Sequence, residues 1–154
     1  MDRQVSSIIR KIKKKKLTLA FAESVTCGFM AHEMGTVKGA SEIFAGSIVC
    51  YSPLVKTGVL NVSSSLIKKH SAESPQVTKA LIKNLTNIIS ADLYGAVTGL
   101  SSADPKALHP TGTIFLCASD GKKFIAEKKL FRGTPLLIRK KTFRAMIELI
   151  DRLI

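Results

Sequence analysis

A serine between a predicted strand and a predicted helix is the side chain with the clearest chemical potential. The segment AESVTCG occupies residues 22–28, after an apolar run at 17–22 that is typical of a strand, and overlaps residues 25–34, whose pattern predicts a helix. Free N–H groups at the start of a helix can stabilise an oxyanion beside a hydroxyl. These amides would belong to Thr26, Cys27 and Gly28. Ser24 is therefore a candidate nucleophile, although this segment alone favours a simple helix cap.

A serine nucleophile needs a base, because its hydroxyl is weakly nucleophilic at neutral pH. His32 lies two helical turns beyond Ser24, too far to reach it. His70 follows surface lysines, and His109 remains a candidate in a loop that nothing orients. Lys56 is the other option, since a lysine whose pKa falls well below about 10.4 can accept a proton. By itself, Lys56 is more simply an exposed residue of a short helix.

Two further side chains have alternative interpretations. Cys27 is a second candidate nucleophile, because a thiol near a helix N-terminus has a lowered pKa. Arg139 lies three residues after Leu136 and four before Phe143, which places it on the apolar face of the last predicted helix. Such an arginine either extends to the edge of the face or binds an anion in a pocket, and both alternatives stay open.

The elements that must position these residues alternate between helices and strands. Predicted strands cover residues 17–22, 42–51, 93–100, 111–119 and 122–131, and the last two form a hairpin that turns at Asp120-Gly121. Predicted helices cover residues 5–12, 25–34 and 63–70, and others begin at Ser52-Pro53, Ser74-Pro75 and near Pro135. The order predicts one domain over residues 1–154, an α/β fold built as a three-layer α/β/α sandwich with a mixed β-sheet. Its site is expected at the strand ends.

Composition narrows the classes of protein. The 154 residues are 45% hydrophobic and 23% charged, which is typical of a globular domain. No apolar run approaches the roughly 20 residues of a membrane span, and the N-terminus lacks the pattern of a signal peptide. Three cysteines without metal-ligand spacing indicate reduced thiols and a cytoplasmic protein with no metal site.

The formal charge of +13 raises the alternative of a nucleic-acid-binding protein. Six of the seven residues from Arg10 to Lys16 are basic, and a second basic group spans residues 128–144. Neither group is interleaved with the aromatic side chains that single-strand binders use for stacking. We therefore expect solvated helix faces and no specific nucleic-acid partner.

Four ordered blocks resemble the CinA C-terminal domain family of competence/damage-inducible proteins. The family motif A-E-S-C-T-G-G is matched by AESVTCG, and Y-S-N-x-x-K by Tyr51 to Lys56. The motif V-T-G-I-A-G-P-x-G, followed by P-V-G-T-V, is matched by VTGLSSADP and PTGTI, and G-D-R-x-x-I-R by residues 133–139. The resemblance covers nearly the whole chain from Leu17 onward, with compatible spacing.

The resemblance implies hydrolysis of nicotinamide mononucleotide to nicotinate mononucleotide and ammonia, without a metal or cofactor. It makes Ser24 the nucleophile, Lys56 the base and Tyr51 a hydroxyl that assists proton transfer. The substrate would be bound by Thr98, Gly99, Ser101, Gly112 and, at its phosphate, Arg139. It also implies a homo-oligomer. Many family members carry a further N-terminal domain, for which these 154 residues leave no room.

The chain departs from the family pattern around the expected pocket. Val25 and Cys27 replace a cysteine and a glycine of the nucleophile motif, and SSADP replaces the glycine-rich loop, changing residues 102–105. Thr134 and Pro135 replace an aspartate and an arginine. The nucleophile and base positions remain, so an enzyme with altered specificity and an inactive paralogue are both open alternatives.

Overall fold

A five-stranded mixed sheet forms the centre of the protein, whose computed structural model describes residues 3–154. The strands are β1 (Leu19–Glu23), β2 (Phe44–Val49), β3 (Leu93–Gly99), β4 (Thr113–Ser119) and β5 (Phe124–Leu130). Their order across the sheet is β2-β1-β3-β4-β5, with β1 parallel to both β2 and β3. The β3–β4 and β4–β5 pairs are antiparallel, which confirms the predicted mixed sheet.

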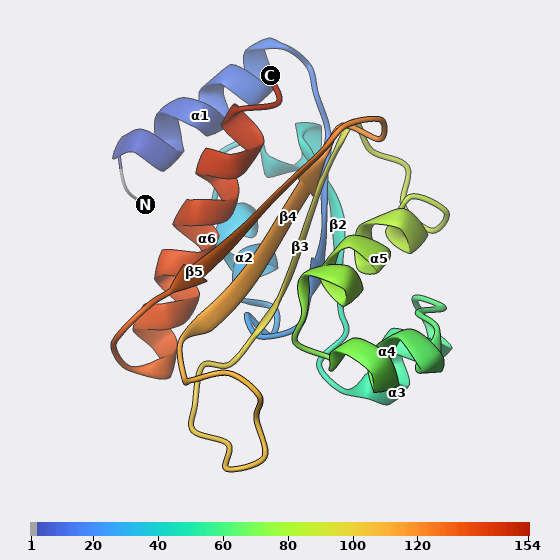
Figure 1. The fold of residues 1–154 in the computed structure, drawn as a ribbon. Coiled ribbons are helices and arrows are strands. Elements are labelled where there is room, and N and C mark those ends of the chain that lie inside the picture. The colour runs from blue at the N-terminus through green and yellow to red at the C-terminus, as the bar shows by residue number, and fades with distance from the viewer. Residues whose placement is uncertain (1–2) are drawn as a thin grey trace.

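Helices cover both faces of this sheet (Figure 1). One face carries α1 (Arg3–Lys14), α2 (Phe29–Gly35) and α6 (Pro135–Asp151), which contribute to one continuous apolar cluster. The other face carries α5 (Pro75–Leu85), which contacts β1, β3 and β4, together with α3 (Pro53–Gly58) and α4 (Ser64–His70). The three-layer α/β/α sandwich is therefore confirmed. None of the helices in residues 3–154 has the length and apolarity that crossing a bilayer requires.

Local sequence signals explain where three of the helices begin. Ser52, Ser74 and Thr134 each stand before a proline, and each side-chain oxygen accepts a hydrogen bond from a backbone N–H three residues later. The proline lacks an N–H that the first turn would leave unpaired, so this pairing suits a helix start. The predicted starts at residues 52–53, 74–75 and near 135 are thus confirmed.

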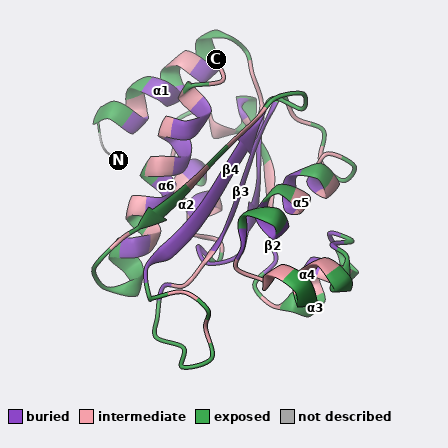
Figure 2. Ribbon diagram, viewed as in Figure 1, coloured by how far each residue is buried: buried purple, intermediate pink, exposed green. Residues whose placement is uncertain are grey.

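Side chains of β1 alternate between the two faces, as the pleat of a strand requires. Leu19 and Phe21 belong to the cluster beneath α1, α2 and α6, whereas Ala20 and Ala22 belong to the cluster beneath α5. Strands β1, β3 and β4 are buried almost throughout (Figure 2). Strand β2 is not, since it lies at the edge of the sheet and its residues are half-buried or exposed. The apolar run at residues 42–51 predicts a buried strand, and that interpretation is wrong.

Two helix predictions also need correction. The helix expected over residues 25–34 begins only at Phe29, because Cys27 and Gly28 have left-handed φ angles of 51° and 87° that interrupt a right-handed helix. Ser24 therefore stands in a turn directly after β1, and not at the first turn of a helix. The helical spacing of apolar residues from Val77 to Ile89 predicts a helix that continues to residue 89, but α5 ends at Leu85 and the apolar residues at 88 and 89 lie beyond it.

The parallel part of the sheet determines where a site can form. Strands β2, β1 and β3 run in the same direction, so their carboxyl ends meet at one edge of the sheet. Ser24 follows β1, Cys50 follows β2 and Gly99 ends β3. The loop between β3 and β4 projects from the same edge (Figure 1). Such an edge is the usual position of ligand sites in open α/β sheets.

Candidate active site

Ser24 and Lys56 form a buried pair at this edge of the sheet. The Lys56 Nζ lies 2.9 Å from the Ser24 Oγ, although the two residues are 32 positions apart. Lys56 is 0% exposed and Ser24 is 4% exposed. The Nζ also donates to the carbonyl oxygens of Cys50 at 2.7 Å and Tyr51 at 3.1 Å. The interpretation of Lys56 as an exposed helix residue is therefore wrong.

Burial gives Lys56 the electrostatics of a base. Removal from water lowers the pKa of its amine from 10.5, while Cys50 and Glu73 act in the opposite direction and raise it. Burial also raises the pKa of the Cys50 thiol to about 11. An uncharged amine has two N–H groups and one lone pair. With the N–H groups directed to two carbonyls, the lone pair faces the Ser24 hydroxyl, whose proton it can accept.

The carboxylate of Glu23 anchors the turn that carries Ser24. Glu23 is 0% exposed, yet it accepts hydrogen bonds from the backbone N–H groups of Gly28 and Met30, both at 3.0 Å, and Ala31 at 2.8 Å. The Ser47 hydroxyl donates a fourth hydrogen bond at 2.8 Å. Glu23 thus links the start of α2 to β2. Sequence reasoning missed this role, although an acidic residue just before a helix is a recognisable signal.

The expected oxyanion donors need correction. The amide of Gly28 already donates to Glu23, and the amide of Cys27 donates to the Ser24 carbonyl at 3.1 Å. Among residues 3–154, the amides of Val25 and Thr26 have no hydrogen-bond partner. The Thr26 Oγ1 is the buried side-chain oxygen that lacks a partner within the same residues. Of the three expected donors, the Thr26 amide therefore remains available, the Cys27 and Gly28 amides are already engaged, and the Val25 amide is a further free donor in this turn.

A cavity of about 170 Å³ opens beside Ser24. Its lining comprises Ser24, Val25, Tyr51, Glu73, Gly99, Leu100, Ser101, Ser102 and Asp104. The structure thus brings Tyr51, Gly99 and Ser101 to the candidate nucleophile, as predicted, with the Tyr51 residue 60% exposed. Sequence reasoning missed Glu73 as a part of the site. Its only sequence signal is its place just before the Ser74 cap of α5.

Thr98 and Gly112 do not line this cavity. The Thr98 hydroxyl is buried against the Thr78 hydroxyl at 2.8 Å, where it links β3 to α5. Gly112 has a φ of 89°, and a Cβ there would collide with the carbonyl oxygen of Phe131. Both residues therefore support the surrounding framework, and this structure does not bring them to the cavity wall.

Arg139 lies behind the nucleophile turn. Its half-buried side chain donates from Nε to the Val25 carbonyl at 3.2 Å, and the residue is not among those lining the cavity. The same helix face was expected to bury Leu136, which is instead 52% exposed. Arg139 therefore joins α6 to the turn through its Nε, and its role at a phosphate stays a prediction.

No histidine within residues 3–154 bonds to Ser24. His32 is exposed, and His109 packs edge-on against the Phe115 ring with centroids 5.1 Å apart. The exposed thiol of Cys27 is in the same turn as Ser24, but the Lys56 amine lies at hydrogen-bonding distance from the serine hydroxyl. The pair formed by Ser24 and Lys56 is thus the nucleophile–base arrangement that the described part of the chain offers.

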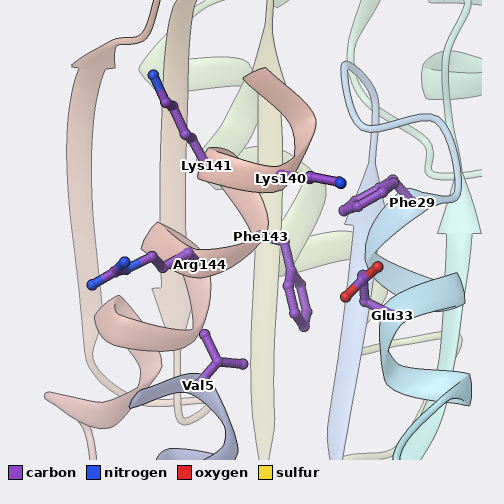
Figure 3. Close-up of a pocket in the computed structure, with 7 residues that line it drawn as sticks. All are labelled: Val5, Phe29, Glu33, Lys140, Lys141, Phe143 and Arg144. Carbon is purple, nitrogen blue, oxygen red and sulfur yellow. The ribbon is translucent and has the colours of Figure 1, made fainter. Parts of the chain in front are cut away.

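A larger hollow of about 370 Å³ lies elsewhere, on the face covered by α1, α2 and α6 (Figure 3). It is lined by Val5, Phe29, Glu33, Lys140, Lys141, Phe143 and Arg144. Neither Ser24 nor Lys56 belongs to this lining, and its mixture of cations and apolar side chains contains no nucleophile–base pair. The smaller cavity beside Ser24 is therefore the candidate active site.

Comparison with known proteins gives a consistent family signal. The family model for the CinA C-terminal domain matches residues 2–154. A CinA-like protein of Pseudothermotoga lettingae is 36% identical over 112 residues, covering 72% of this chain and 28% of that protein. A CinA-like protein of Thermosipho melanesiensis is 31% identical over 150 residues, covering 96% of this chain and 37% of that protein. The chain thus spans about a third of the length of these curated relatives.

Solved structures show the same fold. The competence damage-inducible protein A of Klebsiella pneumoniae superposes with a TM-score of 0.91 at 20% identity, covering 97% of this chain and 94% of that one. The competence/damage inducible protein CihA of Agrobacterium tumefaciens gives a TM-score of 0.90 at 21% identity, covering 99% and 97% of the two chains. At these identities the likeness establishes the architecture alone.

Proposed function

The chain belongs to the CinA C-terminal domain family, and we propose that it is an amidase in which Ser24 attacks the carbonyl carbon of a primary amide. The observation that carries the proposal is the 2.9 Å contact between the Ser24 Oγ and a buried lysine amine. Burial lowers the pKa of Lys56, and a lysine whose pKa is lowered in this way can act as the base that activates a serine hydroxyl. Because Lys56 supplies the base, the reaction needs no metal-bound hydroxide.

Proton transfers at Lys56 balance the proposed reaction. The Nζ takes the Ser24 proton while the Oγ bonds to the amide carbon, and the resulting oxyanion accepts hydrogen bonds from the free amides of Val25 and Thr26. Collapse of this intermediate breaks the C–N bond, and Lys56 returns the proton to the departing ammonia. Water, deprotonated by Lys56, then attacks the acyl-serine ester. The C–Oγ bond breaks, and Lys56 returns the proton to the Ser24 Oγ, which leaves the product acid to ionise to a carboxylate. The Tyr51 hydroxyl, at the cavity wall, is a further candidate for proton transfer.

Nicotinamide mononucleotide is the substrate that the family resemblance favours, with nicotinate mononucleotide and ammonia as products. The size of the cavity supports binding of its carboxamide ring. At about 170 Å³ it is smaller than the roughly 300–1,000 Å³ of pockets that enclose whole drug-sized ligands. A carboxamide-bearing ring suits this space better than an entire nucleotide, so the ribose and phosphate would extend outward.

Ammonia release from nicotinamide mononucleotide by the purified protein tests the proposal. We expect Ser24→Ala to lower the rate by about three orders of magnitude or more, because the covalent step is lost. Cys27→Ala is the matched control, since it removes a thiol from the same turn and should retain most of the activity. An active Ser24→Ala variant, or loss of activity in Cys27→Ala alone, would reverse the assignment.

A further inference from the structure

The candidate active site has an acidic lining in a strongly basic chain. The sequence has 24 Lys and Arg residues against 11 Asp and Glu residues. Yet the charged side chains that line the cavity beside Ser24 are Glu73 and Asp104, and no lysine or arginine of residues 3–154 joins them. Lys56 is fully buried and lies outside this lining. The cavity therefore carries a local charge opposite to that of the molecule.

Glu73 is held in place at this cavity. Its Oε2 accepts a hydrogen bond from the Ser71 hydroxyl at 3.0 Å, and the half-buried residue comes just before the Ser74 cap of α5. Within residues 3–154 no lysine or arginine forms a salt bridge with it. Its charge nevertheless reaches the reaction centre, because it raises the pKa of Lys56. Asp104 is more exposed, and its Oδ1 already accepts the Lys106 amide at 2.9 Å.

We propose that Glu73 is a specificity-determining residue that makes the cavity select amides carried on a positively charged ring over uncharged rings of the same shape. This inference rests on the proposed function for the place of the amide. A fixed carboxylate beside a partly desolvated cavity attracts a cation more strongly than it would in water. The same charge opposes an anion, so a phosphate on the ligand lies outside the cavity and contributes little to affinity.

A pair of small probes isolates the charge. Nicotinamide and 1-methylnicotinamide share the carboxamide ring and differ by one methyl group, which makes the second permanently cationic. Binding is measured by calorimetry to the full chain carrying Ser24→Ala, so that no turnover interferes. We expect the cation to bind about tenfold more tightly than the neutral ring, the difference expected from one carboxylate at a partly hydrated site. Adding Glu73→Gln should bring the ratio close to one.

Matched variants separate charge from structure. Glu33→Gln makes the same substitution in the lining of the larger hollow and should leave the ratio unchanged. Glu73→Asp keeps the charge and should keep most of the preference, which a purely structural role would not predict. Thermal unfolding of each variant verifies that it is folded.

The results are read independently of catalysis. Equal affinity for the two probes, absent binding of the cation, or a preference that survives Glu73→Gln would each overturn the inference. Ammonia release tests the proposed function separately. A charge preference that depends on Glu73 in a protein that releases no ammonia would refute the proposed function and support the inference. Ammonia release by a protein that shows no charge preference would support the proposed function and refute the inference.

Discussion

The amine of Lys56 determines the expected pH dependence of the proposed reaction. Only its uncharged form accepts the Ser24 proton, and burial lowers its pKa below 10.5. The rate at saturating substrate should therefore rise with pH and level off below 10.5. Glu73 raises this pKa, so Glu73→Gln should move the rising limb to lower pH, whereas Glu33→Gln should not. The test is a pH–rate profile of ammonia release. If the rising limb stays at the same pH in Glu73→Gln, the assignment of Lys56 as the base is contradicted.

Removing the amine itself gives a sharper test of the same residue. Lys56→Met keeps the aliphatic stem in the buried site but loses the proton acceptor, so ammonia release should fall by about three orders of magnitude. The carbonyl oxygens of Cys50 and Tyr51 lose the donor that they share. This loss costs at most about 1–3 kcal/mol of folding stability per carbonyl. Part of it is offset, because the variant has no amine charge to remove from water on folding. The variant should stay folded by circular dichroism. A folded variant with normal turnover excludes Lys56 as the base.

Residue types at the site were foreseeable, but their contacts were not. The motif containing Ser24 and the spacing from Tyr51 to Lys56 indicated both partners. The sequence alone still favoured an exposed Lys56, because local pattern cannot show that α3 directs this side chain to Ser24 at the end of β1. Glu73 was missed for the same reason. It lies in a loop without regular periodicity, and only the tertiary fold brings that loop to the cavity.

Among the secondary-structure elements, the start of α2 depends on Glu23. Its carboxylate accepts four hydrogen bonds, three of them from backbone N–H groups at or near the first turn. Glu23→Gln replaces one accepting oxygen with an NH₂ donor that faces other donors. We expect a loss of roughly 2–3 kcal/mol in the free energy of unfolding, measured with urea, and a lower turnover number because the Ser24 turn loosens.

Glu42→Gln is the matched control for this substitution. Glu42 pairs with Lys13 at the surface, with 61% of its side chain exposed, so the same change should alter stability little. Equal stability of Glu23→Gln and the wild type would show that the carboxylate is not the anchor of the turn.

A substitution at Gly112 tests whether this residue supports the fold at the β3–β4 connection. A Cβ at this position, where φ is 89°, would collide with the Phe131 carbonyl, so Gly112→Ala should destabilise the fold. Gly58→Ala is the control, because a Cβ there meets nothing within 4 Å. Urea unfolding should show a loss of more than about 1 kcal/mol for the first variant and almost none for the second. A Gly112→Ala protein of normal stability that no longer binds nicotinamide mononucleotide would indicate instead that Gly112 contacts the substrate.

Element types were predictable where local and tertiary signals agree. The serine–proline starts of α3 and α5 and the hairpin turn at Asp120-Gly121 follow from local chemistry, and the structure confirms them. The predicted start of α2 was wrong because the apolar pattern continues through Cys27 and Gly28. These two residues adopt left-handed φ angles, and the Gly28 amide donates to the Glu23 carboxylate. The edge position of β2 is set by strand order, which periodicity does not report.

For the whole molecule, the distribution of charge separates the basic surface from the candidate active site. Ion pairs join Lys11 to Asp151, Lys13 to Glu42, Arg144 to Glu148, and both Lys129 and Arg152 to Glu127. With a net charge of +13, many cations still lack an acidic partner, and the lysine run at the end of α1 is near the C-terminal end of α6 (Figure 1). In the hollow of Figure 3, Phe143 is buried and Phe29 half-buried among Lys140, Lys141 and Arg144, which gives little aromatic surface for stacking.

This arrangement predicts weak, sequence-blind attraction to nucleic acid. Binding by surface lysines releases counterions without reading bases, so affinity for DNA should fall by about tenfold or more between 50 and 200 mM salt. Fluorescence anisotropy with two unrelated duplexes should give equal affinities at each salt concentration. Saturating DNA should leave ammonia release unchanged, because none of the lysines and arginines of residues 3–154 lines the acidic cavity. Tight binding of one duplex at physiological salt, with loss of ammonia release, would make a nucleic-acid-binding function the better explanation of the charge.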